Sequence, residues 1–165
     1  KNEIHHKISV FNNKENKFKN LKFKVHDNCI FDKNYENYFD LILSNPPFFF
    51  ADKVLKSENI SIKNSKYISE LDLEKWLHNI ILYLKAKGTA FIINRFENID
   101  FMLDILKKFN LEVTTTPILS FKGSKPKNVL LKIIKSDYFI EKTSNAIIIH
   151  DDLSNYSKDI VNWFK

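Results

Sequence analysis

The chain alternates between segments with a strand-like spacing of apolar residues and segments with a helical spacing. Lys22 to His26 alternates apolar and polar positions, and Phe39 to Leu43 is a short, almost entirely apolar run. A run of that kind is typical of a strand covered on both faces. Ser44-Asn45-Pro46-Pro47 follows it directly. We therefore expect a buried strand that ends in a rigid polar turn.

The clearest helical pattern begins at Leu73. Apolar residues recur there at positions 73, 76, 77, 80, 81 and 84, which is the spacing of an amphipathic helix. Ser69 is suited to cap the start of this helix, and Gly88 is suited to stop it. The segment Thr89 to Asn94 then has the composition of a strand.

The second half of the chain repeats this alternation. Apolar residues from Ile99 to Phe109 share one helical face, with Asn110 placed to end the helix. Leu111 to Thr116 and Val129 to Ile134 resemble two strands of an antiparallel hairpin. Further on lie an apolar run, 146–149, and a helical stripe, 156–165. Together the segments predict one α/β domain with a largely parallel sheet.

Composition limits the functional classes. The 165 residues suffice for one domain, and no apolar run reaches the roughly 18 residues of a membrane span. A lone Cys29 excludes an intrachain disulfide, so a cytoplasmic location is the expectation. The net charge is +6, but Arg95 is the only arginine, so the excess lysine is only a weak indication of nucleic-acid binding. The histidines show no metal-binding spacing.

The turn after the apolar run carries the candidate chemistry. Ligands of open α/β sheets bind at the carboxyl ends of strands, where this turn is expected. The Asn45 side chain and the Pro46 carbonyl are suited to accept hydrogen bonds from one planar NH2 group, and Phe48 is suited to stack on its ring. The alternative is a strand-ending turn whose phenylalanines belong to the core.

The string Phe-Asp-Leu-Ile-Leu-Ser-Asn-Pro-Pro-Phe, residues 39–48, resembles motif IV of S-adenosylmethionine-dependent methyltransferases that modify amino or amide nitrogens. The resemblance implies a class I, Rossmann-like methyltransferase fold with S-adenosylmethionine as cofactor. It also implies catalytic roles for Asn45, Pro46, Pro47 and Phe48. Two acceptors on the protons of a conjugated amine favour the pyramidal nitrogen that attacks a methyl sulfonium, so positioning supplies the catalysis.

The wider chain resembles the tRNA adenine N6-methyltransferases that modify valine tRNA. Asp27 stands a dozen residues before Phe39, as the acid that binds the cofactor's adenine amine does in that subfamily. The Lys-Ala-Lys-Gly turn, the Lys-Pro-Lys loop and the closing Asn155-Tyr156 segment also match in order and spacing. These features imply an RNA substrate, namely tRNA. Asn128 stands where relatives often carry arginine, which puts an RNA contact there in doubt.

One part of the family pattern is missing. The family's glycine-rich turn after its first strand has no counterpart, since the only glycines are Gly88 and Gly123. Glu3 is the candidate for the acid that binds the cofactor's ribose. We therefore expect residues 1–165 to be the C-terminal part of one methyltransferase domain that lacks its first strand.

The family's sheet order, three-two-one-four-five-seven-six, makes that strand central, so its absence leaves a hydrophobic edge open. We expect the isolated chain to be unstable unless a separate N-terminal polypeptide segment completes it. A cooperative thermal transition of the chain alone would contradict this expectation.

Two alternatives remain open. The same fold and motif serve methylation of guanine N2 or of a protein glutamine amide. The missing glycine turn also fits an inactive fragment or pseudoenzyme that binds no cofactor alone.

Overall fold

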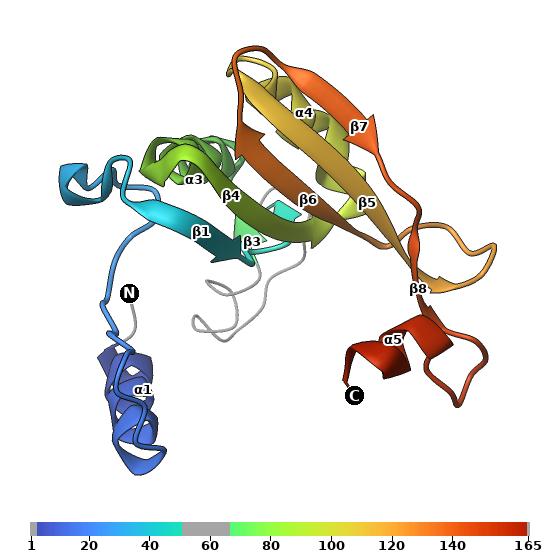
Figure 1. The fold of residues 1–165 in the computed structure, drawn as a ribbon, viewed down its shortest axis with the longest axis horizontal. Helices are drawn as coiled ribbons and strands as arrows, with labels where there is room; N and C mark the ends of the chain where they lie inside the picture. Colours follow the sequence, from blue (N-terminus) through green and yellow to red (C-terminus); the bar gives the residue numbers. More distant parts are fainter. Residues whose placement is uncertain (1–2, 51–66, 165) are drawn as a thin grey trace.

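The computed structural model describes residues 3–50 and 67–164. Figure 1 shows a main sheet with two helices packed behind it and two further helices that lie away from it. The described elements are, in chain order, α1 (Glu3–Glu15), η1 (Lys33–Tyr35), β1 (Phe39–Ser44), β2 (Phe49–Phe50), β3 (Tyr67–Ile68), α3 (Glu70–Tyr83), β4 (Leu84–Arg95), η3 (Phe96–Asn98), α4 (Ile99–Leu106), β5 (Leu111–Phe121), β6 (Asn128–Lys135), β7 (Ile140–Thr143), β8 (Ile147–His150) and α5 (Lys158–Trp163).

The strand order in the main sheet is β1-β4-β6-β5-β7, with β8 also paired to β5, and β2 and β3 form a separate two-stranded sheet. Parallel and antiparallel pairings are mixed in the main sheet. β1 and β4 are parallel, with Ser44 opposite Ile92 at their carboxyl ends. β6 is antiparallel to both β4 and β5, whereas β7 and β8 each run parallel to β5. The predicted hairpin and the predicted α/β class are both confirmed.

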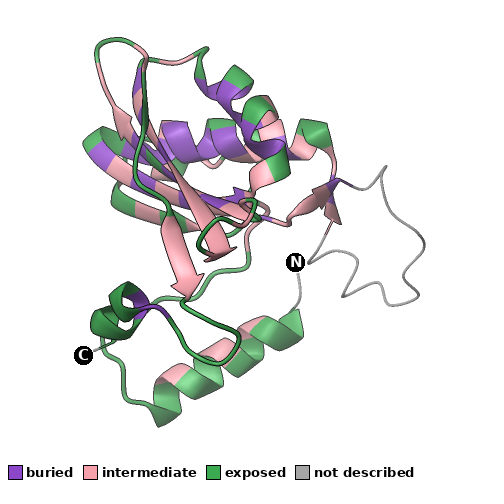
Figure 2. Ribbon diagram, turned by 90° about the vertical axis from the view of Figure 1, so that its right-hand side faces the viewer, coloured by how far each residue is buried: buried purple, intermediate pink, exposed green. Residues whose placement is uncertain are grey.

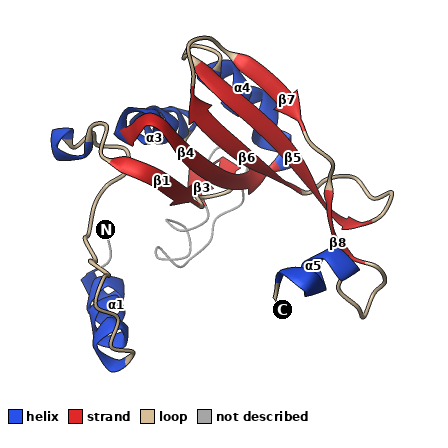
Figure 3. Ribbon diagram, in the orientation of Figure 1, coloured by secondary structure: helices blue, strands red, loops and turns tan. Residues whose placement is uncertain are grey.

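The core lies between the sheet and the two helices α3 and α4, which cover the same face (Figure 3). Because successive side chains of a strand alternate between faces, every second residue of β4 from Gly88 to Asn94 is buried, including Ala90 and Ile92. Leu131 on β6 and Leu77 on α3 are fully buried in the same cluster. Figure 2 shows this burial concentrated between the strands and the helices.

The opposite face of β1 is bare. Leu41 and Leu43 of β1 are 54% and 74% exposed, and α3 and α4 lie on the other side of the sheet (Figure 1). β1 pairs with β4 alone among the described strands, so its other edge is open. The predicted strand is therefore confirmed, but it is covered on one face instead of two. That a first strand is missing beside this edge stays a prediction from the family's sheet order.

Two local predictions are wrong. Lys22 to His26 forms no strand, because no described strand lies beside it to supply backbone hydrogen bonds. Gly88 does not end the first helix: α3 ends at Tyr83, and Gly88 lies inside β4. Its role there is close approach, since a Cβ at Gly88 would lie 3.0 Å from the carbonyl oxygens of Lys85 and Phe39.

Several other predictions are confirmed. The Ser69 hydroxyl accepts a hydrogen bond from the backbone N–H of Asp72 and so caps α3. The second helix forms as α4, although it ends three residues before Phe109. The C-terminal helix forms as α5, capped by Ser157, while Lys165 lies outside the described residues. The sequence did not predict α1 as a helix from Glu3, and none of its residues is buried.

None of the helices in the described part of the chain is long and apolar enough to cross a membrane.

Candidate functional site

The polar turn of residues 45–48 leaves the sheet at the carboxyl end of β1. Because β1 and β4 are parallel, the carboxyl ends of both strands lie at this edge. Asn45 is exposed, Pro46 is buried, and Pro47 and Phe48 are half-buried. Among the described residues, neither the Asn45 side chain nor the Pro46 carbonyl makes a hydrogen bond. Both oxygens are therefore available as acceptors beside an aromatic ring.

Two buried asparagines hold the end of this turn. The side-chain NH2 of Asn98 donates to the Phe48 carbonyl at 2.9 Å and to Oδ1 of Asn94 at 2.8 Å. That same Oδ1 accepts the backbone N–H of Arg95 at 2.7 Å. Asn94 is fully buried and Asn98 is 4% exposed, so solvent competes little with these bonds. The pair ties the end of β4 to the carbonyl of Phe48.

The start of the turn is held from α3. The indole N–H of Trp76 donates to the Ser44 hydroxyl at 3.1 Å. This bond places Ser44 on the helix-covered face of the sheet, so Asn45 is the first residue beyond the strand. The turn is thus fixed at both ends by side chains that come from separate elements.

A cavity of about 650 Å³ runs along the open edge of β1 and reaches Ser44, next to the turn. Its walls come from β1, from α3 through Trp76, and from the N-terminal segment through Lys24, His26 and Asn28. The volume falls within the usual range for pockets that hold small ligands. The cavity and the turn therefore lie side by side at one end of the sheet.

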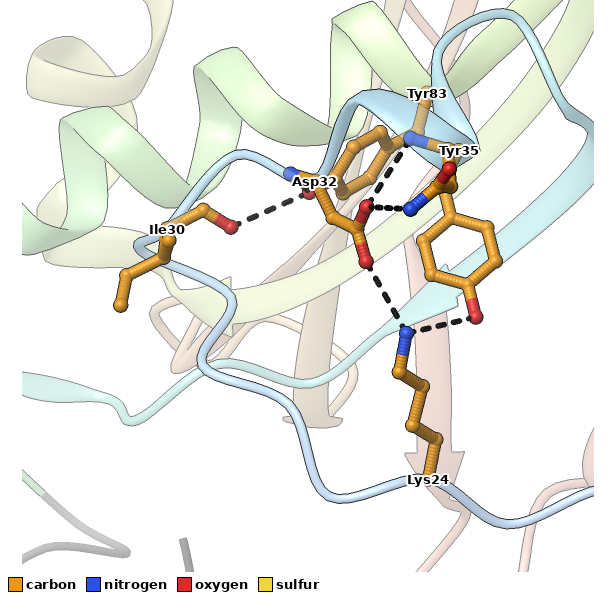
Figure 4. Close-up of polar contacts among 6 residues, drawn as sticks. Lys24, Ile30, Asp32, Tyr35 and Tyr83 are labelled. Atoms are coloured by element: carbon orange, nitrogen blue, oxygen red, sulfur yellow. Dashed lines mark hydrogen bonds and ion pairs between the residues drawn. The ribbon is translucent and has the colours of Figure 1, made fainter.

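The N-terminal wall of this cavity is fastened to α3 by polar contacts (Figure 4). The Tyr83 hydroxyl accepts the backbone N–H of Asp32 at 2.8 Å and donates to the Ile30 carbonyl at 3.4 Å. Lys24 forms an ion pair with Asp32 at 3.1 Å and donates to the Tyr35 hydroxyl at 3.2 Å. These bonds hold a segment that has no regular secondary structure against the body of the molecule.

The same contacts shift two pKa values. The backbone N–H of Asn34 and the Lys24 ammonium both stabilise the charged carboxylate, so the pKa of Asp32 lies below its ordinary value. Hydrogen bonds to Tyr35 and Asp32 raise the pKa of Lys24. Both groups are therefore charged at neutral pH.

The two residues expected to bind the cofactor lie in different places. Asp27 sits between His26 and Asn28, both of which line the cavity, and its Oδ1 accepts the Cys29 N–H at 3.2 Å. Glu3 begins α1, is exposed, and does not line the cavity. Neither Asp27 nor Glu3 lines the cavity, although both chain neighbours of Asp27 do, so the cofactor roles of both residues stay predictions.

Sequence reasoning missed the supporting residues Trp76, Asn94 and Asn98. The only signal for them was that an apolar strand, Thr89 to Asn94, ends in asparagine, a residue that is costly to bury without partners. No group of histidine, cysteine and acidic residues suited to a metal ion occurs within residues 3–50 and 67–164.

Comparisons with known proteins identify the fold of the chain and nothing more specific. No protein-family model matches the sequence, and no curated protein does. Among solved structures, the chain is similar to a predicted O-methyltransferase, protein Atu636 from Agrobacterium tumefaciens, with a TM-score of 0.58 and 14% identity. The match covers 82% of this chain and 58% of that one. The chain has the class I, Rossmann-like methyltransferase fold.

A second solved structure, a complex of M1.HpyAVI with SAM, matches with a TM-score of 0.36 and 13% identity. It covers 72% of this chain and 51% of that one, and so weak a likeness adds nothing to the fold assignment. The chain spans only 58% of the length of the first structure and 51% of the length of the second.

Proposed function

We propose that the chain is the catalytic C-terminal part of an S-adenosylmethionine-dependent methyltransferase that modifies the N6 amine of adenine in RNA, namely tRNA. The observation that carries the proposal is the Asn45–Phe48 turn at the carboxyl end of a parallel strand. Its two acceptors, the Asn45 side-chain oxygen and the Pro46 carbonyl, belong to consecutive residues and accept no hydrogen bond from the described part of the chain. The methyltransferase fold of the chain is consistent with this placement.

The residues of the turn divide the work. The Asn45 oxygen and the Pro46 carbonyl accept the two protons of the target amine and hold its nitrogen lone pair toward the methyl donor. The ring of Pro47 fixes the φ angle of this residue and so the path of the backbone from Pro46 to Phe48. The Phe48 ring stacks on the base. When bound, S-adenosylmethionine supplies an electrophilic methyl group. Positioning of the amine is the contribution of this chain.

The residues present fit one end of that cofactor. The cavity has the right size for a nucleoside, and its walls include Tyr38 and Trp76. Asp27, between the lining residues His26 and Asn28, is the residue that the resemblance assigns to the adenine amine. The ribose and amino-acid ends lack the partners that the resemblance implies, since Glu3 lies on exposed α1. Neither glycine serves there, because Gly88 lies in β4 and Gly123 follows β5. We therefore assign only the adenine end to residues of this chain.

The first test is calorimetric titration of the chain with S-adenosylhomocysteine, after its intact mass is confirmed. Saturable binding near one ligand per chain supports the proposal. No binding by a folded chain favours the second candidate, an inactive fragment or pseudoenzyme, which the missing glycine turn and the open edge of β1 support.

The second test is transfer of a labelled methyl group to tRNA, followed by mass spectrometry of the modified nucleoside. Asn45→Ala should abolish transfer, because it removes one of the two acceptors for the amine. Asn145→Ala is the matched control, since Asn145 is exposed and lies between β7 and β8. Label in guanine N2, or in a protein glutamine, would refute the adenine assignment and leave the methyltransferase chemistry in place.

A further inference from the structure

Arg95, the only arginine in the sequence, stands beside the turn of residues 45–48. It is the last residue of β4, and its cross-strand partner is Asn128 at the start of β6. Its Cζ lies 5.7 Å from the centre of the Phe49 ring, directly after the turn. A guanidinium over an aromatic face is held in one orientation by cation–π attraction.

The charge of Arg95 is not compensated. Every ion pair among the described residues has a lysine as its cation, and no carboxylate pairs with the Arg95 guanidinium. Its Nε is buried without a hydrogen-bond partner, and so is Oδ1 of the neighbouring Asn128. Arginine that is partly buried is normally paired, because desolvation of the charge is costly. An unpaired guanidinium here indicates a site for an anion from outside the described chain.

Further positive charge lies close to Arg95. The loop between β5 and β6 carries three exposed lysines, Lys122, Lys125 and Lys127. The Lys127 carbonyl accepts the backbone N–H of Phe96, the residue after Arg95, at 3.0 Å. This bond fixes the end of the loop next to Arg95. The charges thus gather at the edge of the sheet from which the turn projects.

We propose that Arg95, together with the lysines of this loop, binds a phosphodiester of the RNA strand whose base enters the turn at Asn45. A planar guanidinium with five donors matches a phosphate better than a point charge does, and the nearby Phe49 ring attracts its charge. The inference rests on the proposed function, because it takes RNA as the substrate. It assigns the RNA backbone contact to the end of β4, across the strand pair from Asn128.

The test measures the affinity of the chain for a fluorescently labelled oligoadenylate RNA over a series of salt concentrations. Arg95→Gln should weaken binding about five- to tenfold and reduce the slope of log affinity against log salt by about 0.7, the value for one lost contact with a single strand. Arg95→Lys should keep the slope and lose part of the affinity, since it retains the charge and loses the planar set of five donors.

Lys87→Gln is the matched control, because Lys87 is an exposed cation at the other end of the same strand. It should leave both quantities unchanged. Unaltered binding by a folded Arg95→Gln variant, an equal loss in Lys87→Gln, or no RNA binding by the wild type would each overturn the inference. Titration of the same proteins with S-adenosylhomocysteine separates the two proposals. If the chain binds no S-adenosylhomocysteine but its RNA affinity depends on Arg95, the methyltransferase proposal is refuted and the phosphate site is supported.

Discussion

Asn98→Ala tests whether the buried asparagine pair holds the candidate active-site turn. The substitution removes the donor that serves both the Phe48 carbonyl and Oδ1 of Asn94. Oδ1 of Asn94 keeps its bond from the Arg95 N–H, whereas the Phe48 carbonyl loses the hydrogen bond from Asn98. An acceptor left without a partner in a partly buried place costs about 1–3 kcal/mol. We expect the free energy of unfolding to fall by about 2 kcal/mol.

Thermal melting followed by circular dichroism measures this loss. For a chain of this size, 2 kcal/mol corresponds to a fall in Tm of about 4–8 °C. Asn110→Ala is the control, because Asn110 is exposed and its side chain makes no hydrogen bond among the described residues. Its Tm should change by no more than about 2 °C.

Asn98→Asp sharpens the test because it keeps the shape of the side chain and removes both donors. Above the pKa of the new carboxyl, its negative charge faces two acceptor oxygens, so this variant should be less stable than Asn98→Ala. Protonation restores one donor, so the stability of Asn98→Asp relative to the wild type should rise as pH falls. If Asn98→Asp equals the wild type at neutral pH, the amide is not the donor and the reasoning fails.

Three further predictions concern stability and association. Asp32→Asn should lower Tm at neutral pH and lose this effect in acid. The lowered pKa of Asp32 stabilises the fold at pH values above the ordinary carboxyl pKa, and this contribution is lost as pH falls through the lowered pKa. Melting curves of both proteins over a pH series check this, and a difference in Tm that stays constant with pH contradicts it. Leu131→Ala should cost about 2–5 kcal/mol in denaturant unfolding, since Leu131 is fully buried, while Leu153→Ala, at an exposed position, should cost under about 0.5 kcal/mol. Leu43→Lys should reduce concentration-dependent association in light scattering, and an unchanged profile would show that the open face of β1 does not drive it.

Local patterns were sufficient where a segment's own periodicity determines its structure. The helical spacing from Leu73 and the cap at Ser69 predicted α3, and the apolar run from Phe39 predicted β1. The end of α3 was misjudged because Leu84 suits either the last turn of a helix or the first residue of a strand. Pairing of Leu84 with Phe39, 45 positions earlier, decides for the strand. A single segment holds no information about such a partner.

The same limit applies to the site. The turn of residues 45–48 was predictable, because its chemistry lies in consecutive residues. Its support was not, because Asn98 reaches Phe48 across 50 positions and Trp76 reaches Ser44 across 32. Lys22 to His26 has the alternating pattern of a strand but forms none, because no described strand lies beside it to pair with. Whether Asp27 and Glu3 bind a cofactor remains a prediction.

The two margins of the main sheet are finished differently. At one margin β7 and β8 lie end to end along β5, and both are short. β7 also presents charged Glu141 and Lys142, features that discourage further pairing. At the other margin, β1 pairs with β4 alone among the described strands, so its outer edge has no strand partner in that part of the chain. A sheet with only one edge open to pairing can add one other sheet and no more. Self-association through β1 would therefore produce dimers and not growing fibrils.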